Sequence, residues 1–193
     1  MQKPSRIVKK VYKEHIEKFG EPTQSFRYDN PPNNDGITYP PFVDIMVWFP
    51  DEDVNITTFA TIGMSDRKMK GVEHRVELHM AVEGILDENT IGKLAIFLAN
   101  LSLYPFMNST HFDWWHTIPD AGKIPGFIST ESLLLHPSFV KDGWDIICTE
   151  WGHIKIINVV PITKKDQQLS KEKGINYLLN YLSDNDINYF EPR

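Results

Sequence analysis

The amino-acid sequence predicts an α+β fold, in which helices pack against a mixed, mostly antiparallel β-sheet. Three observations lead to this prediction. Side chains alternate between apolar and polar over residues 72–82, which is typical of a β-strand. Apolar side chains recur at helical spacing over residues 90–104, and strand-like runs lie on both sides of this segment. We expect the 193 residues to form a single domain that is long enough to bury a substantial core.

The N-terminal part of the chain is predicted to form an amphipathic helix over residues 5–19. Its apolar residues repeat at helical spacing, Ser5 precedes them and Gly20 follows them. We expect this helix to lie on a larger structure. Residues 21–41 are polar and rich in turn-forming residues, so they are predicted to be a surface excursion with one short strand near residues 26–28.

Three strands with short connections are predicted next, and together they indicate an antiparallel meander. Residues 42–49 are almost continuously apolar, as in a strand that is covered on both faces. Residues 55–64 form the second strand and residues 72–82 the third. The apolar residues of the third strand share one face. The other face is expected to be solvated or to form cross-strand ion pairs, with a binding face as the alternative, and it carries Glu73, Arg75, Glu77 and His79.

Residues 90–104 are predicted to form the central helix of the fold. Asp87 can cap its start, and Pro105 is expected to end it, because the proline ring clashes with the preceding turn. Apolar residues occur around most of its circumference, so we expect this helix to be buried on most sides rather than to lie on the surface.

The C-terminal part of the chain is predicted to add strands and a helical region. A short strand is expected over residues 132–135, and a compact turn joins residues 144–149 to residues 153–160 in a hairpin. Thr163 begins a capping box that opens the final helical region, in which Gly174 is an expected break.

Composition and charge limit the classes of function. The formal net charge of −6 argues against nucleic acid as a direct partner and fits a basic protein partner. The lone Cys148, expected to be a small buried side chain, excludes an internal disulfide framework and a cysteine-rich zinc site. No segment approaches the roughly 18 apolar residues of a membrane span, and residues 1–10 lack the apolar core of a signal peptide. The expected compartment is therefore the cytoplasm, with no membrane partner.

One group of polar residues could carry chemistry, namely His111, Asp113 and His116 with His79, Glu77 and Glu73. A hydrolase would use His79, His111, Asp113 and His116 from this group. Imidazoles and carboxylates can hold a metal ion or act as general acid and base, so a metal-dependent hydrolase is an alternative function. Their spacing, however, matches no metal-ligand signature. Hydrogen bonds from Asp113 and His116 to the loop backbone explain the same residues, and on this interpretation the protein has no catalytic residue, metal or cofactor.

Tryptophans outside the regular apolar pattern indicate a protein interface. Trp114 and Trp115 lie in the loop after the central helix, and Trp151 lies in the hairpin turn. Large aromatic side chains in such places can anchor a partner. Because side chains alternate along an extended chain, we expect one ring of the Trp114–Trp115 pair to point inward and the other outward. The candidate partner-binding residues are Asp113, Trp114, Trp115, His116, Glu73, Glu77 and Trp151.

Four blocks of sequence carry a resemblance to a known family. Residues 71–80, 98–106, 112–119 and 151–163 resemble the suppressor of fused (SUFU) family in content, order and spacing. The resemblance extends from about residue 39 to about residue 182 and is greatest to the short, bacterial-like members. In the longer members it corresponds to the N-terminal domain.

The resemblance implies a non-enzymatic protein-binding domain. Members of this family are not known as enzymes, and the animal protein holds Gli transcription factors through a peptide laid as a strand between two domains. This chain resembles only the first of those domains. Bacterial relatives are often proposed to be immunity proteins, so the resemblance implies a toxin as the protein partner, and the net charge of −6 fits a toxin with a basic surface. A structural subunit of a homo-oligomer is a third interpretation.

Overall fold

The computed structural model describes residues 3–30 and 38–191, so residues 31–37 of the predicted surface excursion lie outside the described residues. Its centre is a mixed sheet in the order β1-β2-β3-β4-β8-β6-β5, with β7 paired to β8 off this path. The β4–β8 pair is parallel and the other pairs are antiparallel. The predicted α+β class is confirmed. The strands are β1 (Gln24–Asp29), β2 (Phe42–Trp48), β3 (Ile56–Ile62), β4 (Arg75–Glu83), β5 (Thr117–Ile118), β6 (Ser132–His136), β7 (Ile146–Thr149) and β8 (Gly152–Ile162).

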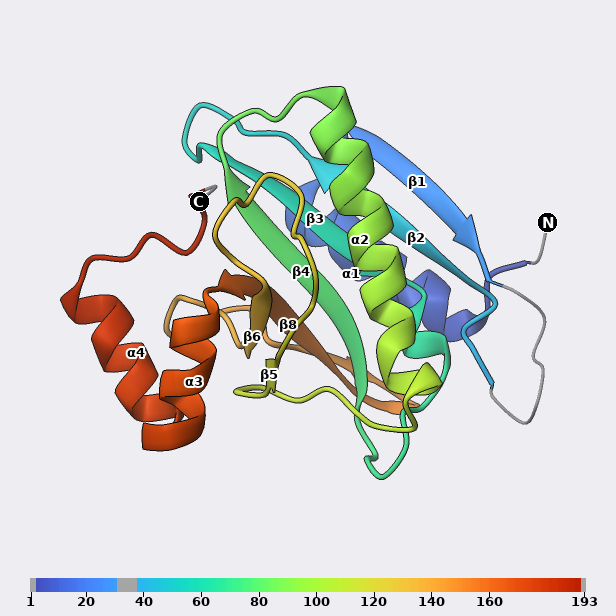
Figure 1. The fold of residues 1–193 in the computed structure, drawn as a ribbon. Coiled ribbons are helices and arrows are strands. Elements are labelled where there is room, and N and C mark those ends of the chain that lie inside the picture. The colour runs from blue at the N-terminus through green and yellow to red at the C-terminus, as the bar shows by residue number, and fades with distance from the viewer. Residues whose placement is uncertain (1–2, 31–37, 192–193) are drawn as a thin grey trace.

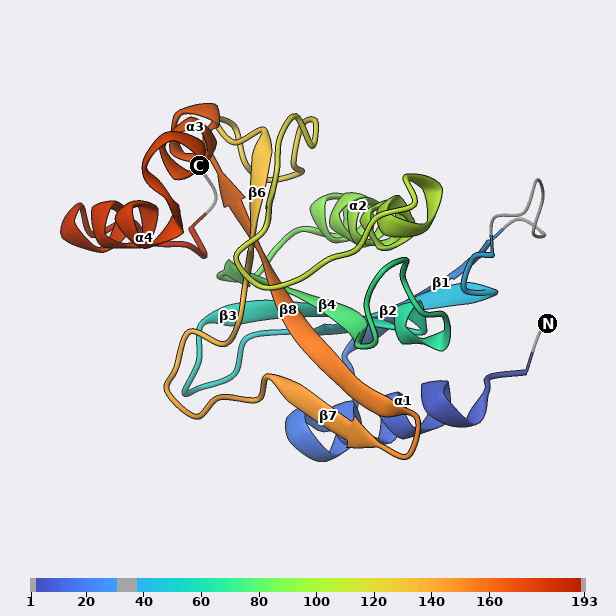
Figure 2. The same ribbon diagram turned by 90° about the horizontal axis from the view of Figure 1, so that it is seen from below.

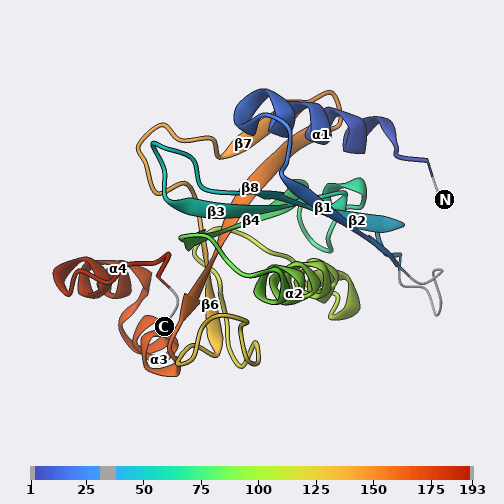
Figure 3. The same ribbon diagram turned by 90° about the horizontal axis from the view of Figure 1, so that it is seen from above.

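Helices cover both faces of the sheet (Figure 1). Seen along the sheet, α2 lies on one face and α1 on the opposite face, while α3 and α4 lie at the end where β8 finishes (Figure 3). The hairpin of β7 and β8 reaches toward α1 (Figure 2). The helices are α1 (Arg6–Phe19), the short 3₁₀ turn η1 (Met64–Asp66), α2 (Glu88–Met107), α3 (Lys164–Lys173) and α4 (Ile175–Asp184).

The predicted N-terminal helix is confirmed as α1. The Oγ atom of Ser5 accepts a hydrogen bond from the amide of Val8, and the helix ends at Gly20, whose φ of 77° is accessible to glycine without strain. The apolar face of α1 packs into a core cluster with residues of β2, β3, β7 and β8. This cluster is one of the two layers of core on either side of the sheet.

The predicted meander is also confirmed. Ile45 of β2 pairs with Thr61 of β3, and Phe59 of β3 pairs with Met80 of β4, both in antiparallel register. The short strand expected near residues 26–28 is β1, which extends the meander at the edge of the sheet. The β2 strand is buried along almost its whole length, as its continuous apolar sequence predicts.

The polar face of β4 corrects the sequence prediction. Val76, Leu78 and Met80 lie in the core beneath α2, as expected. Glu77 and His79 on the opposite face are not solvated, since they are 0% and 5% exposed. The reason is that α1 and η1 cover this face, so these polar groups are paired inside the protein rather than with water.

The central helix α2 agrees with the prediction at its start and differs from it at its end. Asp87 caps its start, as predicted, by accepting hydrogen bonds from the amides of Asn89 and Thr90. Pro105 does not end the helix, which continues to Met107, because a proline in the last turn removes only one late hydrogen bond. Residues 90–104 are buried or half-buried on most sides, as expected, but one outer side is exposed, where Ile96 and, beyond the predicted segment, Met107 are 51% and 59% exposed.

Helix α2 is also long and apolar enough to cross a membrane, by length and composition only. This finding differs from the expectation that no segment approaches such a length. Half of its most apolar window is buried inside the protein, and the core helix of a globular domain passes the same test.

The C-terminal predictions are confirmed except for Cys148. Thr163 and Asp166 form the capping box that opens α3, and Gly174, with a φ of 88°, separates α3 from α4. Cys148 lies on β7 but is exposed rather than buried. Its neighbour Ile147 takes the inward position of this edge strand, so the alternation of the strand turns Cys148 outward.

Candidate functional site

The loop of residues 111–116 joins β5 through a β-bulge. The amide of Trp115 donates to the carbonyl of Leu135 at 2.6 Å, and the amide of Leu135 donates to the carbonyl of His116 at 2.8 Å. Two residues of the loop therefore oppose one residue of β6. Trp115 adopts a φ of 71°, a left-handed conformation that this kind of bulge usually gives to glycine.

Trp114 points inward and fixes the loop to β8. Its Nε1 atom donates to the carbonyl of Ile156 at 3.0 Å, and the Nζ atom of Lys155 lies 4.4 Å from the centre of its ring. Asp113 accepts hydrogen bonds from Lys155 Nζ at 2.5 Å and from the amide of Trp114 at 2.7 Å. Partial burial alone would raise the pKa of Asp113, but these hydrogen bonds outweigh it and hold the pKa below its ordinary value.

Trp115 points outward, so the predicted split between the two tryptophan rings is confirmed. Its side chain is 39% exposed, whereas Trp114 is packed against the core. The ring of Trp115 meets the ring of His136 edge-on at 4.7 Å, and His136 in turn stacks on Phe139 at 4.5 Å. Burial lowers the pKa of His136. The exposed ring is therefore supported from one side by two further rings.

His111 and His116 lie on the other side of the loop, where their rings are 5.4 Å apart. They line a hollow of about 470 Å³ between the loop and the last turns of α2, together with Tyr104 and Asn108. Asp113 faces Lys155 instead and does not join the two imidazoles. The loop thus presents aromatic and imidazole groups without a cluster of carboxylates.

The remaining candidate residues lie apart from this loop. Glu73 is exposed and forms an ion pair with Lys68 at 2.6 Å. Trp151 is exposed at the tip of the β7–β8 hairpin. Glu77 is completely buried, so its prediction as a partner-binding residue is wrong. The cause is the cover supplied by α1 and η1, which the alternation of β4 does not reveal.

Glu77 instead holds the backbone of η1 in place. Its carboxylate accepts hydrogen bonds from the hydroxyls of Thr61 (2.7 Å) and Ser65 (2.6 Å) and from the amides of Gly63 (2.9 Å) and Ser65 (3.1 Å). Burial raises the pKa of Glu77 to about 7, and these hydrogen bonds oppose the rise. Gly63 is needed here, because its φ is 121° and a Cβ atom would lie 2.8 Å from the carbonyl oxygen of Phe42.

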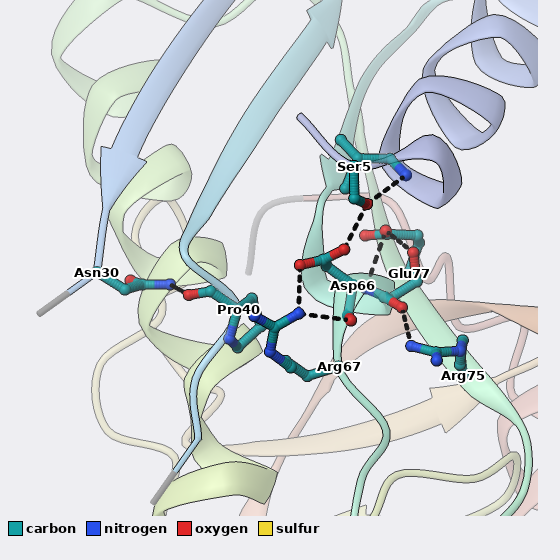
Figure 4. Close-up of polar contacts among 9 residues, drawn as sticks. Ser5, Asn30, Pro40, Asp66, Arg67, Arg75 and Glu77 are labelled. Atoms are coloured by element: carbon teal, nitrogen blue, oxygen red, sulfur yellow. Dashed lines mark hydrogen bonds and ion pairs between the residues drawn. The ribbon is translucent and has the colours of Figure 1, made fainter. Parts of the chain in front are cut away.

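The same corner connects α1 to the sheet, as Figure 4 shows. The hydroxyl of Ser5 donates to Asp66 in η1, and Asp66 also pairs with Arg67 at 2.6 Å. Arg75 of β4 donates to the carbonyl of Ser65 at 2.6 Å. These polar contacts have a structural role, since they fix one turn and one helix start.

His79 does not join the loop histidines. Its Nε2 atom lies 2.9 Å from Nε2 of His15 on α1, and Nδ1 of His15 lies 2.8 Å from the carbonyl oxygen of Val11. Burial lowers the pKa of both imidazoles, that of His15 to about 4. Trp48 and Trp144 surround the pair on the α1 side of the sheet. Within residues 3–30 and 38–191, no group of three or more histidine, cysteine, aspartate and glutamate side chains could hold a metal ion.

Two residues of the site were not identified from the sequence. Lys155 alternates with apolar residues in β8, and His136 ends a short apolar strand, so neither differs from an ordinary strand residue by its pattern. Their roles follow from long-range contacts, with Asp113 and Trp115 respectively. No local sequence signal marks such pairs.

Comparisons with known proteins agree on one family. Its profile, described as Suppressor of fused protein (SUFU), matches residues 40–193. No curated protein matches the chain. Among solved structures, a chain of the Sufu–Fu complex is similar, with a TM-score of 0.66 and 15% identity over 93% of this chain and 85% of that one.

Two further solved structures share the fold. A SUFU homologue from Neisseria gonorrhoeae FA 1090 has a TM-score of 0.61 and 13% identity over 95% of this chain and 92% of that one. Drosophila Suppressor of Fused has a TM-score of 0.59 and 16% identity over 91% of this chain and 45% of that one. The present chain therefore spans a little under half of the Drosophila chain.

Proposed function

Because the chain belongs to the suppressor of fused family, we propose that it is a single, non-enzymatic protein-binding domain that contacts its partner through the loop of residues 111–116. A chain with the same fold is part of a Sufu–Fu complex, which supports a protein as the kind of partner. The proposed partner site consists of Asp113, Trp114, Trp115 and His116. Of these, Trp115 is expected to supply most of the binding energy.

The observation that carries this proposal is the conformation of Trp115. A left-handed backbone costs a residue with a side chain about 1–2 kcal/mol, and the large ring remains 39% exposed. The contact with His136 covers one side of the ring, and the rest of it remains open to solvent. Such strain is often retained where a side chain must be presented in one direction. The inward anchors at Trp114 and Asp113 hold the loop so that the ring is already oriented before binding.

The finer proposal is an immunity protein that acts in the cytoplasm and neutralises a toxin. The net charge of −6 fits a partner with a basic surface, and a bacterial protein shares the fold. Attraction between an acidic and a basic surface accelerates association and is screened by salt. Raising the salt concentration should therefore slow association while changing dissociation much less.

The test uses the products of genes adjacent to the one that encodes this chain. Each product is co-expressed with the chain, and binding is measured by titration calorimetry for the wild type and for Trp115→Ala. We expect one product to bind, and the variant to bind it at least about tenfold more weakly, or roughly 1.4 kcal/mol.

Tyr177→Ala is the matched control, because Tyr177 is an aromatic residue on α4 with an exposure of 45%, against 39% for Trp115. It should bind like the wild type. Circular dichroism should show that both variants are folded. If a bound partner tolerates Trp115→Ala, the partner surface lies elsewhere, and Glu73 and Trp151 are the next residues to replace.

A further inference from the structure

Trp115 belongs to a row of aromatic rings that continues beyond the proposed partner site. The ring of Trp115 meets that of His136 at an angle of 74°, and His136 stacks on Phe139 with the two ring planes 8° apart. His136 ends β6 and is only 9% exposed, and Phe139 is half-buried. The row therefore leads from an exposed ring to side chains that are packed inside the domain.

The C-terminal segment of residues 187–190 supplies the other end of this row. Between ring centres, Tyr189 lies 5.5 Å from Phe139 and 6.2 Å from His136, and Phe190 lies 5.0 Å from Phe139. Rings from three separated parts of the chain thus form one continuous cluster. This aromatic row consists of Trp115, His136, Phe139, Tyr189 and Phe190.

The C-terminal segment is fixed to the sheet by contacts that do not involve Trp115. The carbonyl of Phe190 accepts a hydrogen bond from the amide of Glu83, at the end of β4, at 2.8 Å. The side chain of Asn188 donates to the carboxylate of Glu83 at 2.7 Å and accepts from the amide of Phe190 at 3.0 Å. Ile187 and Tyr189 also pack against the core cluster formed by α4, β6 and β8. The segment can therefore support the rings that pack on it.

His136 transmits this support because its own ring is held in place. Its Nδ1 atom lies 2.8 Å from the carbonyl oxygen of Pro137, and Nδ1 is the donor because a carbonyl oxygen only accepts. The same carbonyl accepts a hydrogen bond from Asn158 of β8 at 3.0 Å. Phe139 covers one face of the imidazole. An exposed tryptophan samples several rotamers unless a neighbouring group blocks some of them, so the placement of His136 restricts the ring of Trp115.

We propose that Phe139 and Tyr189 are positioning residues of the partner site, which act through His136 to fix the direction of the Trp115 ring. This inference rests on the proposed function, in which Trp115 anchors a protein partner. A ring that is fixed before binding loses less freedom when the partner covers it, so the affinity is higher. The C-terminal segment thereby contributes to affinity without belonging to the contact surface.

Fluorine NMR of the full chain labelled with 5-fluorotryptophan tests the positioning without a partner. The signal of Trp115 is identified by its loss in Trp115→Phe. In the wild type we expect one Trp115 signal, shifted from that of an exposed fluoroindole by the neighbouring ring of His136. In Phe139→Leu, which removes the ring but keeps an apolar side chain, this signal should move toward the exposed position or split. Phe139→Tyr retains the ring and should give the wild-type signal.

Tyr189→Leu and Tyr181→Leu provide a matched pair of variants. Both tyrosines are half-buried and pack against the same core cluster, but the ring of Tyr189 contacts Phe139, whereas that of Tyr181 faces Lys165. Tyr189→Leu should shift the Trp115 signal and Tyr181→Leu should not, while circular dichroism shows that each variant is folded. Tyr189→Leu carries the test alone if Phe139→Leu does not fold.

Two outcomes of these spectra overturn the proposal. An unchanged Trp115 signal in folded Phe139→Leu or Tyr189→Leu overturns the role of the residue that was replaced. An equal shift in Tyr181→Leu overturns the proposal as a whole, because the effect would then be a general loosening of the core cluster.

The partner found by the test of the proposed function allows a second measurement. Phe139→Leu should weaken binding about two- to tenfold, which is the cost of ordering one side chain on binding. In a Trp115→Ala background the same change should have no further effect, because a positioning residue acts only through the ring that it positions. Equal losses in both backgrounds would contradict the inference. If Trp115→Ala binds normally, the proposed function fails, whereas the fluorine spectra still decide whether Phe139 and Tyr189 position the ring.

Discussion

The environment of Glu77 in the structure differs from the one that the sequence predicts. Its place in an alternating strand predicts a solvated side chain. The apolar and polar alternation of β4 would be the same whether or not α1 packs on this face. The structure buries it completely and surrounds it with four donated hydrogen bonds. The packing of α1 and η1 on this face of the sheet decides between these outcomes. This long-range effect is why the polar face of β4 could not be predicted from local alternation.

The raised pKa of Glu77 gives a pH dependence of stability. The folded protein binds a proton at this carboxyl more tightly than the unfolded chain does, since the pKa rises from 4.5 to about 7. The resulting stabilisation is fully present below about pH 4.5 and is lost as the pH rises through 7. The change corresponds to on the order of 3 kcal/mol. Urea unfolding of the wild type and of Glu77→Gln, measured from pH 4.5 to 8, should show this loss in the difference between the two proteins.

The two proteins must be compared because His15 and His79 change the pH dependence of stability in the opposite direction. Their lowered pKa values stabilise the fold above about pH 6.5 and cause a loss as the pH falls, and both proteins share this effect. Glu73→Gln is an exposed control, and its free energy of unfolding should differ little from that of the wild type over the same pH range. A flat difference curve for Glu77→Gln would contradict the assignment.

Trp115 allows a matched comparison of two substitutions. Alanine and glycine both remove the ring, so they lose the contact with His136 equally. They differ in the left-handed backbone, which glycine adopts without strain. Trp115→Gly should therefore be about 1 kcal/mol more stable than Trp115→Ala in urea unfolding. If the alanine variant is the more stable of the two, the bulge is not strained.

The helices and strands could be predicted more readily from the sequence than the solvent exposure of their faces. The helices, the meander and the hairpin follow from periodicity and from caps such as Ser5, Asp87 and Thr163, all of which act within a few residues. The one exposed side of α2, with Ile96, could not be located from the sequence, because apolar residues occur around most of the circumference of this helix. The same limit applies to Cys148, whose apolar strand turned out to be an edge.

The two faces of α2 differ enough to be distinguished by mutation. Leu98 is fully buried, so Leu98→Ala should cost about 2–5 kcal/mol through lost burial and the remaining cavity. Ile96→Ala changes an exposed residue on the same helix and should cost less than about 1 kcal/mol. Urea unfolding measures both. Equal costs would mean that the helix is rotated relative to the structure.

At the scale of the whole molecule, the sheet separates residues that the sequence suggests could act together. His79 lies on the α1 side with His15, while His111 and His116 line a hollow beside the last turns of α2. The family was predictable from four sequence blocks, and the profile match extends the predicted range to residue 193. The separation of the histidines was not predictable, because which strand face is covered by which helix is a property of the complete fold.

The separation of these residues leads to a prediction about metal. With His79 paired to His15 and Asp113 paired to Lys155, His111 and His116 supply only two ligands, fewer than a structural or catalytic zinc site uses. Protein purified without chelators should carry far less than one zinc, iron or manganese ion per chain, as measured by elemental analysis. About one metal per chain that is lost in His111→Ala would revive the hydrolase interpretation.

The parallel pairing of β4 with β8 has a consequence for how the chain is made. Arg75 pairs with Ile154, and His79 with Asn158, so the centre of the sheet joins segments that a ribosome synthesises far apart in time. Until β8 has emerged, the backbone N–H and C=O groups along one edge of β4 lack the strand they pair with, and long-range pairing of this kind forms slowly. A nascent chain stalled before residue 152 should therefore expose an unpaired strand that is prone to aggregate, and it should depend on a chaperone. Residues from 152 onward, about the last fifth of the sequence, thus determine when the preceding strands become protected from aggregation.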